Sequence, residues 1–195
     1  VLLHFGAVDY KCTVTLNGTV VGEHTGGYLP FTFDVTAAIL NGENDLRVTV
    51  TDPTDTGSQA RGKQTFNRGG IWYTPQSGIW QTVWLEYVPE TYIRSIKMLP
   101  DVNGEKLDVT VKLSSKADVS AVVTYNGEFV GKATASSRSG MATFSVGIPS
   151  PHLWSVGDAK LYDIEITAGD DKVTSYFGMR DVDIDGNKFK INGRS

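Results

Sequence analysis

Hydrophobic and polar residues alternate along most of this chain, and this alternation constrains the fold more than any other feature of the sequence. Val8, Tyr10, Cys12, Val14 and Leu16 occupy every second position. A period of two places such side chains on one face of a β-strand. The same pattern recurs at residues 46–50, 107–113, 119–125 and 162–166. The sequence therefore predicts a protein built almost wholly of half-buried strands.

The dipeptide Asn-Gly follows many of these runs, beginning at residues 17, 41, 103, 126 and 192. It tolerates the positive φ values that tight hairpin turns require. Short strands with frequent turn signals are typical of β-sandwiches. A helix is indicated only at 36–40, where we expect Thr36 to cap a single turn and Gly42 to end it. We therefore predict an all-β fold.

The chain of 195 residues is long enough for two sandwiches of ordinary size. Val88-Pro89-Glu90 interrupts the strand pattern, and a new pattern starts at Tyr92. We predict a first domain at residues 1–89, a second at 90–180 and a separate hairpin at 181–195.

Composition excludes some classes of partner. The net charge is -4 and the pI is about 5.3, so neither nucleic acid nor an anionic membrane is an expected partner. No apolar run approaches the roughly 20 residues that cross a bilayer. Cys12 is the single cysteine, which excludes an internal disulfide and leaves a cytoplasmic or a periplasmic or secreted location open. We interpret Cys12 as a small buried hydrophobic residue.

The segment from Asp52 to Trp84 holds the candidate binding residues. A long loop there contains five side chains suited to sugars: Arg61, Lys63, Gln64, Trp72 and Tyr73. Aromatic rings offer flat apolar faces for C–H groups, and the polar side chains donate hydrogen bonds to hydroxyls. An interface between domains uses the same residue types, so both interpretations stay open.

Two other groups of residues have simpler interpretations. Trp80 and Trp84 lie in a segment that has apolar residues on both faces of the expected strand, which predicts core positions for the two tryptophans. Asp181, Asp183, Asp185 and Gly186 match the start of a calcium loop, but the twelfth position is Asn192 instead of glutamate. Val182 and Ile184 alternate with the aspartates, which predicts the buried face of a strand followed by a turn. We therefore assign no metal site.

Five segments together resemble the glycoside hydrolase family 2 enzymes, which include β-galactosidases, β-glucuronidases and β-mannosidases. They are 16–18, 33–35, 70–84, 151–162 and 177–180. The resemblance implies a jelly-roll, galactose-binding-like domain that lacks its first strands, an immunoglobulin-like sandwich, and a hairpin leading into a TIM barrel. It also implies that the unpaired sheet edge of the first domain is filled either by another copy of the chain or by another segment of the parent protein.

The resemblance further implies that the parent enzyme hydrolyses β-glycosidic O-glycosyl bonds with retention and acts on a carbohydrate. Its two catalytic glutamates would lie on the barrel, one of them after an asparagine. This chain has no Asn-Glu pair, so we assign no catalytic residue and no cofactor. β-Galactosidases hold an active-site cation with an aspartate shortly before the Ser-Gly-Ile element. The corresponding stretch here, 70–73, contains no aspartate.

A non-catalytic carbohydrate-binding or adhesin-like protein is the alternative, because two sandwiches alone do not decide function. The continuation of the gene past Ser195 separates the two hypotheses. Several hundred residues of alternating strands and helices would support the enzyme, and further sandwiches would support the adhesin.

Overall fold

The computed structural model describes residues 1–194, and within them it contains strands and turns but no helix. The predicted all-β class with two sandwiches is confirmed. The chain divides into two compact units, Val1–Val88 and Pro89–Ser195, which are described separately below. No helix in the described part of the chain has the length and apolarity that a membrane crossing requires.

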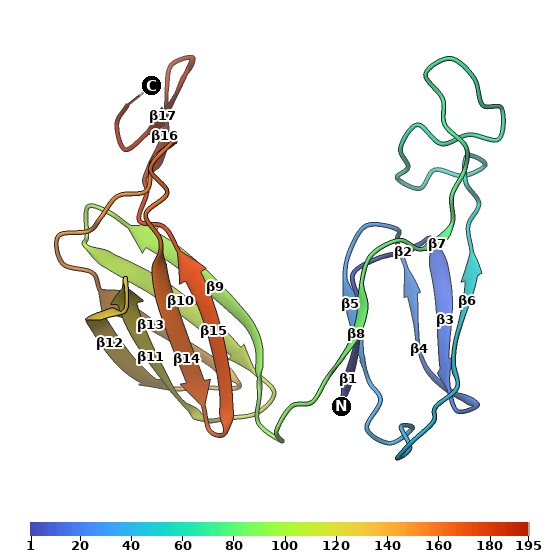
Figure 1. Ribbon diagram of the computed structural model, residues 1–195, viewed down its shortest axis with the longest axis horizontal. Coiled ribbons are helices and arrows are strands. Elements are labelled where there is room, and N and C mark those ends of the chain that lie inside the picture. Colours follow the sequence, from blue (N-terminus) through green and yellow to red (C-terminus); the bar gives the residue numbers. More distant parts are fainter. Residues whose placement is uncertain (195) are drawn as a thin grey trace. The chain divides into compact units, whose positions relative to one another are not determined.

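The first unit is a small sandwich of two three-stranded sheets and one short ladder (Figure 1). Its sheets have the orders β5-β1-β8 and β4-β3-β6, and β2 pairs with β7. The strands are β1 (Leu2–Phe5), β2 (Val8–Asp9), β3 (Lys11–Leu16), β4 (Thr19–Thr25), β5 (Phe31–Asp34), β6 (Leu46–Thr51), β7 (Gly78–Ile79) and β8 (Val83–Glu86). Its core is formed by Leu3, Phe5, Val8, Cys12, Val14, Leu16 and Val35. Burial of Cys12, Val14 and Leu16 confirms a half-buried strand and the interpretation of Cys12 as a small buried hydrophobic residue. The segment from Val8 to Leu16 is not one strand, because it divides at Tyr10 into β2 and β3.

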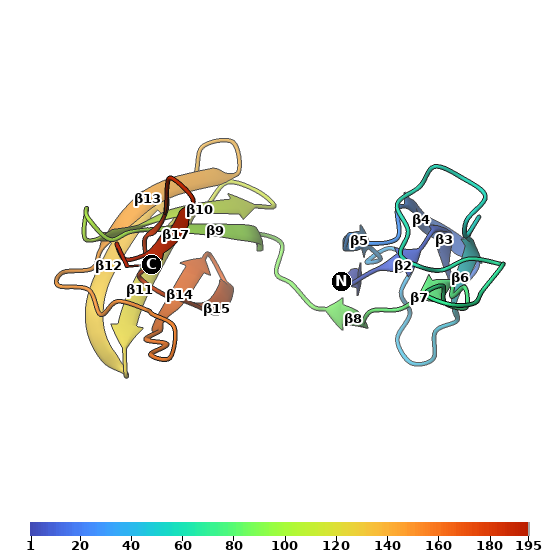
Figure 2. The same cartoon turned by 90° about the horizontal axis from the view of Figure 1, so that it is seen from above.

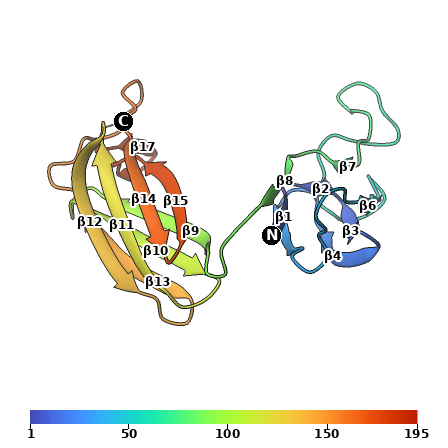
Figure 3. The ribbon, with the colours of Figure 1, turned by 60° about the horizontal axis from the view of Figure 1, so that its bottom comes forward.

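The second unit is a larger sandwich, whose sheets have the orders β13-β10-β9 and β12-β11-β14-β15 (Figure 2). Its strands are β9 (Ile93–Asp101), β10 (Lys106–Leu113), β11 (Asp118–Tyr125), β12 (Glu128–Ser136), β13 (Met141–Gly147), β14 (Tyr162–Ala168) and β15 (Asp171–Phe177). Figure 3 shows β12, β11 and β14 side by side. Alternate residues of β10, β11 and β14 fill the space between the sheets, as the period of two predicts.

Three of the five Asn-Gly pairs, which begin at residues 17, 126 and 192, adopt the left-handed conformation that tight turns require, whereas Asn41 and Asn103 do not have a positive φ. Asn17 and Gly18 have φ values of 52° and 82°, and Asn126 and Gly127 have 51° and 82°. Both residues of each pair are left-handed, as a two-residue hairpin with the twist of its strands requires. The Asn17 amide also donates hydrogen bonds to the Ala38 carbonyl and to Asn44. Its side chain therefore fixes the turn to a neighbouring loop.

The single turn expected near residues 36–40 is present, but its cap differs from the prediction. The Val35 carbonyl accepts hydrogen bonds from the N–H groups of Ala38 and Ile39. Thr36 does not cap the turn. Instead the Asp34 carboxylate accepts from the Thr36 N–H at 2.9 Å and from its hydroxyl at 2.6 Å. An aspartate two residues before the capped N–H satisfies the free donor in the usual way.

The segment after Asp181 forms a hairpin of β16 (Val182–Asp185) and β17 (Lys188–Ile191), which pair only with each other. This confirms the strand-and-turn interpretation. The predicted burial is wrong, because Val182 and Ile184 are both exposed. The hairpin extends past the ends of the sandwich strands in Figure 1. The face that carries Val182 and Ile184 therefore has no described sheet to pack against.

The prediction that Trp80 and Trp84 are core residues is also wrong. Their side chains are 53% and 45% exposed. Trp80 lies just after β7, and Trp84 lies on β8, an edge strand of its sheet. The Trp84 ring stacks on His4 with centroids 4.7 Å apart. The apolar residues on both faces of this segment are therefore explained by exposed aromatic rings, and the Trp80 ring belongs to the candidate site.

Candidate functional site

The loop that joins β6 to β7 is fixed at its base by one aspartate. One Asp52 oxygen accepts a hydrogen bond from the Ser77 hydroxyl at 2.5 Å, and the other accepts from the Thr54 N–H at 2.7 Å. Ser77 and Asp52 stand at the two ends of the loop. The loop therefore leaves and rejoins the sandwich at one place, and it extends beyond the ends of the strands (Figure 1).

Backbone hydrogen bonds within the loop bring two of its segments together. The Tyr73 N–H donates to the Lys63 carbonyl at 2.8 Å, and the Thr65 N–H donates to the Tyr73 carbonyl at 3.2 Å. Gln64 lies between these two bonds and forms a bridge with Tyr73. Arg68 additionally donates to the Thr74 hydroxyl at 3.1 Å. Residues that are ten apart in sequence thereby present their side chains from one small surface.

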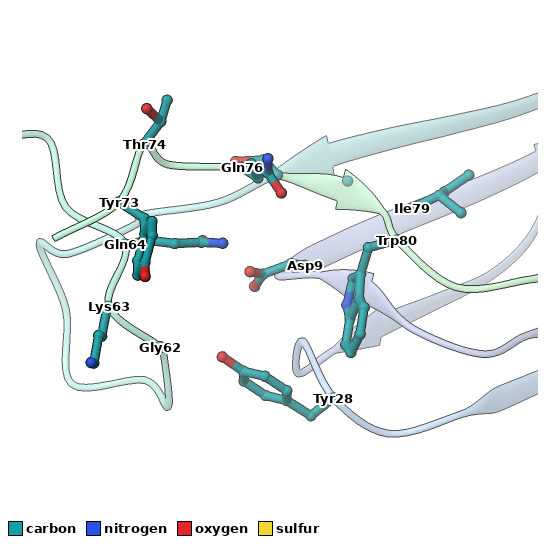
Figure 4. Close-up of a pocket in the computed structure, with 12 residues that line it drawn as sticks. Asp9, Tyr28, Gly62, Lys63, Gln64, Tyr73, Thr74, Gln76, Ile79 and Trp80 are labelled. Carbon is teal, nitrogen blue, oxygen red and sulfur yellow. The ribbon is translucent and has the colours of Figure 1, made fainter. Parts of the chain in front are cut away.

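A hollow of about 820 Å³ lies between this loop and the end of the first sandwich (Figure 4). Its volume is in the range of ligand-binding pockets. The sandwich contributes Asp9, Tyr28, Gly78, Ile79 and Trp80, and the loop contributes Gly62, Lys63, Gln64, Tyr73, Thr74, Gln76 and Ser77. Aromatic rings and hydrogen-bonding groups therefore line the same space.

Trp80 forms a fixed wall of the hollow. Its indole N–H donates to the Gly27 carbonyl at 2.7 Å, and its ring meets the edge of Tyr28 with centroids 6.1 Å apart. The Trp80 backbone N–H donates to the Ala7 carbonyl at 3.4 Å, beside the β2–β7 ladder. Because both ends of the residue are held, the exposed ring keeps one orientation.

Asp9 supplies a carboxylate at the centre of the hollow. Figure 4 shows this carboxylate, the Tyr28 hydroxyl and the Gln64 amide directed into the same space. No ion pair or hydrogen bond within residues 1–194 occupies the Asp9 side chain. Burial raises the pKa of Asp9, and the negative charge of Asp52 raises it further. The carboxylate is thus a free hydrogen-bond acceptor in a place that disfavours negative charge.

Gly27 sets the position of Asp9. A methyl group on Gly27 would lie 2.5 Å from one Asp9 carboxylate oxygen, so a larger residue there would displace the acid. Gly27 also holds Trp80 through its carbonyl. One buried glycine therefore positions both the carboxylate and the aromatic wall.

The raised pKa of Asp9 predicts that Asp9→Asn makes the protein more stable at neutral pH. A carboxyl whose pKa is raised by folding favours the folded state while it is protonated, and this contribution is lost as the pH rises through the folded-state pKa. At neutral pH the ionised Asp9 therefore costs stability, which asparagine does not. We expect a higher melting temperature for the variant at pH 7 and a smaller difference below the ordinary value of 3.8. An unchanged melting temperature at pH 7 would contradict the prediction that the ionised Asp9 carboxylate destabilises the folded protein.

The structure brings together three of the five residues that the sequence singled out. Lys63, Gln64 and Tyr73 line the hollow, whereas Arg61 and Trp72 lie on the same loop outside it. Asp9, Tyr28 and Trp80 were missed. Alternation assigned Asp9 to the polar face of a strand, and only its pairing with Gly78 places it under the loop. Gly26-Gly27 beside Tyr28 was the available signal of a close backbone approach.

The described residues, 1–194, contain no group of three or more His, Cys, Asp or Glu side chains placed to hold a metal ion. The aspartates near 181–185 lie on the β16–β17 hairpin, where the Lys190 ammonium donates to Asp185 at 2.5 Å.

Comparison with sequence models of known families gives two matches in consecutive parts of the chain. Residues 1–78 match the glycosyl hydrolase 2 galactose-binding domain-like family. Residues 91–180 match the glycosyl hydrolases family 2 domain. Together the two matches leave residues 79–90, which include β8, and the final segment 181–195 outside.

Curated relatives align with nearly the whole chain. A β-galactosidase of Staphylococcus xylosus is 27% identical, over 99% of this chain and 19% of its own length. A putative β-glucuronidase of Formosa agariphila is 28% identical, over 98% of this chain and 24% of its own. The β-glucuronidase of Rattus norvegicus is 26% identical, over 100% of this chain and 34% of its own. The chain thus spans at most about a third of these three proteins.

Solved structures share the fold. A Lactobacillus rhamnosus β-glucuronidase superposes with a TM-score of 0.77 at 24% identity, over 98% of this chain and 34% of that one. A Ruminococcus gnavus β-glucuronidase in complex with D-glucuronic acid gives 0.76 at 24% identity, over 99% and 36%. At this level of identity the likeness concerns the fold alone.

Proposed function

Since this chain belongs to glycosyl hydrolase family 2, we propose that it forms two non-catalytic domains of an enzyme that hydrolyses β-glycosidic O-glycosyl bonds with retention of configuration. The observation that carries the proposal is the pair of family matches, which cover residues 1–78 and 91–180 one after the other along the chain. β-Galactosidases and β-glucuronidases among the relatives support it. The two carboxylates that a retaining mechanism needs would come from another domain of the enzyme.

Within that enzyme we propose that the hollow of the first unit contacts the carbohydrate substrate. The chemistry of its lining supports this role. The rings of Trp80 and Tyr73 suit the C–H faces of a sugar, and Asp9, Gln64 and the Tyr28 hydroxyl suit its hydroxyl groups. Lys63 is a further donor at the edge of the hollow. Arg61 and Trp72, on the same loop, stay predicted residues of the active-site rim.

The activity is tested on the full-length protein with aryl β-glycosides. We expect release of the aryl group, and the first-formed sugar should have the β-configuration when it is observed by NMR before mutarotation. A first-formed α-anomer would contradict retention. An absence of hydrolysis across neutral and acidic β-glycosides would contradict the enzyme assignment.

The role of the hollow is tested with Tyr73→Ala in the same enzyme. Tyr73 is 65% exposed, so the change should leave the melting temperature nearly unchanged. Loss of one sugar–aromatic contact should lower kcat/KM by about ten-fold. Tyr176→Ala is a matched control, because Tyr176 is 66% exposed and lies on β15 of the second unit. Equal kcat/KM values for the two variants would contradict the proposal that the hollow contacts the substrate.

A further inference from the structure

On the basis of the proposed function, we propose that Asp9 makes the hollow selective for a neutral sugar and against a sugar acid. Its carboxylate accepts hydrogen bonds from sugar hydroxyls and repels a carboxylate on the sugar. The relevant ligand is therefore an uncharged hexopyranoside unit with at least one free hydroxyl facing Asp9.

The first step of the argument is that Asp9 is available to a ligand. Its side chain has no hydrogen-bond or ion-pair partner among residues 1–194, although it lies at the centre of a hollow large enough for a sugar ring. An ionised carboxylate only accepts hydrogen bonds, and each of its oxygens accepts more than one. Hydroxyl groups are the donors that a sugar provides, so the two are complementary.

The second step concerns charge. Asp52 lies close enough to Asp9 for its negative charge to raise the Asp9 pKa. Asp52 is held there by the Ser77 hydroxyl and the Thr54 N–H, both of which leave its charge uncompensated. A third carboxylate brought by the ligand would meet the same partly buried, negative surroundings. Like charges in such a place disfavour each other strongly.

The third step is that no cation of the lining offsets these acids. Lys63 is the one lysine or arginine that lines the hollow. In Figure 4 its side chain points away from Asp9, whereas the uncharged Gln64 amide points toward it. Recognition of a sugar carboxylate commonly uses an arginine or lysine directed at it. Here the charged side chain directed at the centre of the hollow is the acid Asp9, and the other groups directed there are uncharged.

The final step concerns placement. Only glycine at position 27 leaves the Asp9 carboxylate in its place, because a methyl group there would lie 2.5 Å from an Asp9 carboxylate oxygen. The Gly27 carbonyl simultaneously holds the Trp80 indole. One glycine thus positions both the acceptor for hydroxyls and the wall for the ring face, as a site for one sugar unit requires.

The experiment uses the full-length enzyme and two aryl β-glycosides that share ring configuration and differ only in carrying CH₂OH or a carboxylate at C5. The measured quantity is the ratio of kcat/KM for the neutral glycoside to that for the uronide. We expect the wild-type ratio to exceed 100. Asp9→Asn keeps the shape and removes the charge, so we expect it to lower the ratio at least ten-fold, partly by raising kcat/KM for the uronide.

Two further variants separate charge from fold. Gly27→Ala displaces the carboxylate without neutralising it, so it should lower kcat/KM for the neutral glycoside while the uronide remains disfavoured. Asp163→Asn removes an exposed carboxylate from β14 of the second unit and should leave the ratio unchanged. Melting temperatures of all variants show whether each remains folded.

Preference of the wild-type enzyme for the uronide would overturn the proposal, and so would an unchanged ratio in a folded Asp9→Asn variant. Failure of the underlying functional proposal gives a different result: Tyr73→Ala, Asp9→Asn and Gly27→Ala would then all leave both kcat/KM values unchanged. A lowered kcat/KM in Tyr73→Ala together with a constant ratio in Asp9→Asn would contradict the role of Asp9 alone.

Discussion

Gly131→Ala is expected to destabilise the second sandwich by about 3 kcal/mol, because overpacking against an unyielding neighbour reaches the top of the usual range. A methyl group on Gly131 would lie 2.4 Å from the Gly147 carbonyl oxygen and 3.1 Å from a Val146 methyl. Gly131 belongs to β12 and Gly147 to β13, which are strands of different sheets. The clash therefore pushes the two layers of the sandwich apart at this edge.

The melting temperature of the Gly131→Ala protein should fall by roughly 10 to 20 °C for a domain of this size. Gly147→Ala is the matched control, since a methyl group on Gly147 would meet nothing within 4 Å and its φ is not positive. We expect that variant to melt within a few degrees of the wild type. Similar melting temperatures for the two variants would mean that the sheets do not approach each other at Gly131 as described.

Tyr162→Ala should have an even larger effect, about 4 kcal/mol of unfolding free energy, as is typical for deletion of a large buried ring. Tyr162 is 1% exposed and stacks on Phe177 with ring centroids 5.2 Å apart. Its hydroxyl accepts a hydrogen bond from the His152 N–H at 2.7 Å. The residue thus ties the proline-containing segment at 149–151 to the core.

Tyr162→Phe separates the two contributions, because it keeps the ring and removes the acceptor of the His152 N–H. Leaving a partly buried donor unpaired costs about 1 to 2 kcal/mol. Chemical denaturation of the wild type and both variants gives the free energies directly. A Phe variant as unstable as the Ala variant would show that the hydrogen bond, and not the ring, dominates.

Strands and tight turns could be predicted from the sequence because both depend on local chemistry. The alternation around Cys12 and the left-handed pair Asn17-Gly18 specify their conformations without distant partners. Capping was less predictable. Asp34 and Thr36 are both good capping residues, and their relative positions in the turn decided which one accepts.

The exposed tryptophans show what a pattern of apolar residues cannot specify. Alternation shows which residues share a face, but it does not show whether another layer covers that face. β8 is an edge strand, and Trp84 on it lies over His4 instead of entering the core. The β16–β17 hairpin failed in the same way, because Val182 and Ile184 have the correct parity but no covering sheet.

The candidate site was predicted in part for a related reason. Lys63, Gln64 and Tyr73 could be found because they stand in a conspicuous loop rich in aromatic and polar residues. Asp9 and Tyr28 could not, because they approach that loop only through the β2–β7 pairing and the Gly27 turn. Trp80 was assigned to the core by the pattern of its neighbours.

The closure of the β6–β7 loop at its base has an evolutionary consequence. Asp52 meets Ser77 where the loop leaves and re-enters the sandwich, so the residues between them form a unit whose ends are fixed independently of its contents. Lengthening a flexible loop costs little free energy once its ends are held. Insertions, deletions and substitutions within 53–76 can therefore accumulate at little cost to the folding of the sandwich, so the lining of the hollow can change while the domain is retained.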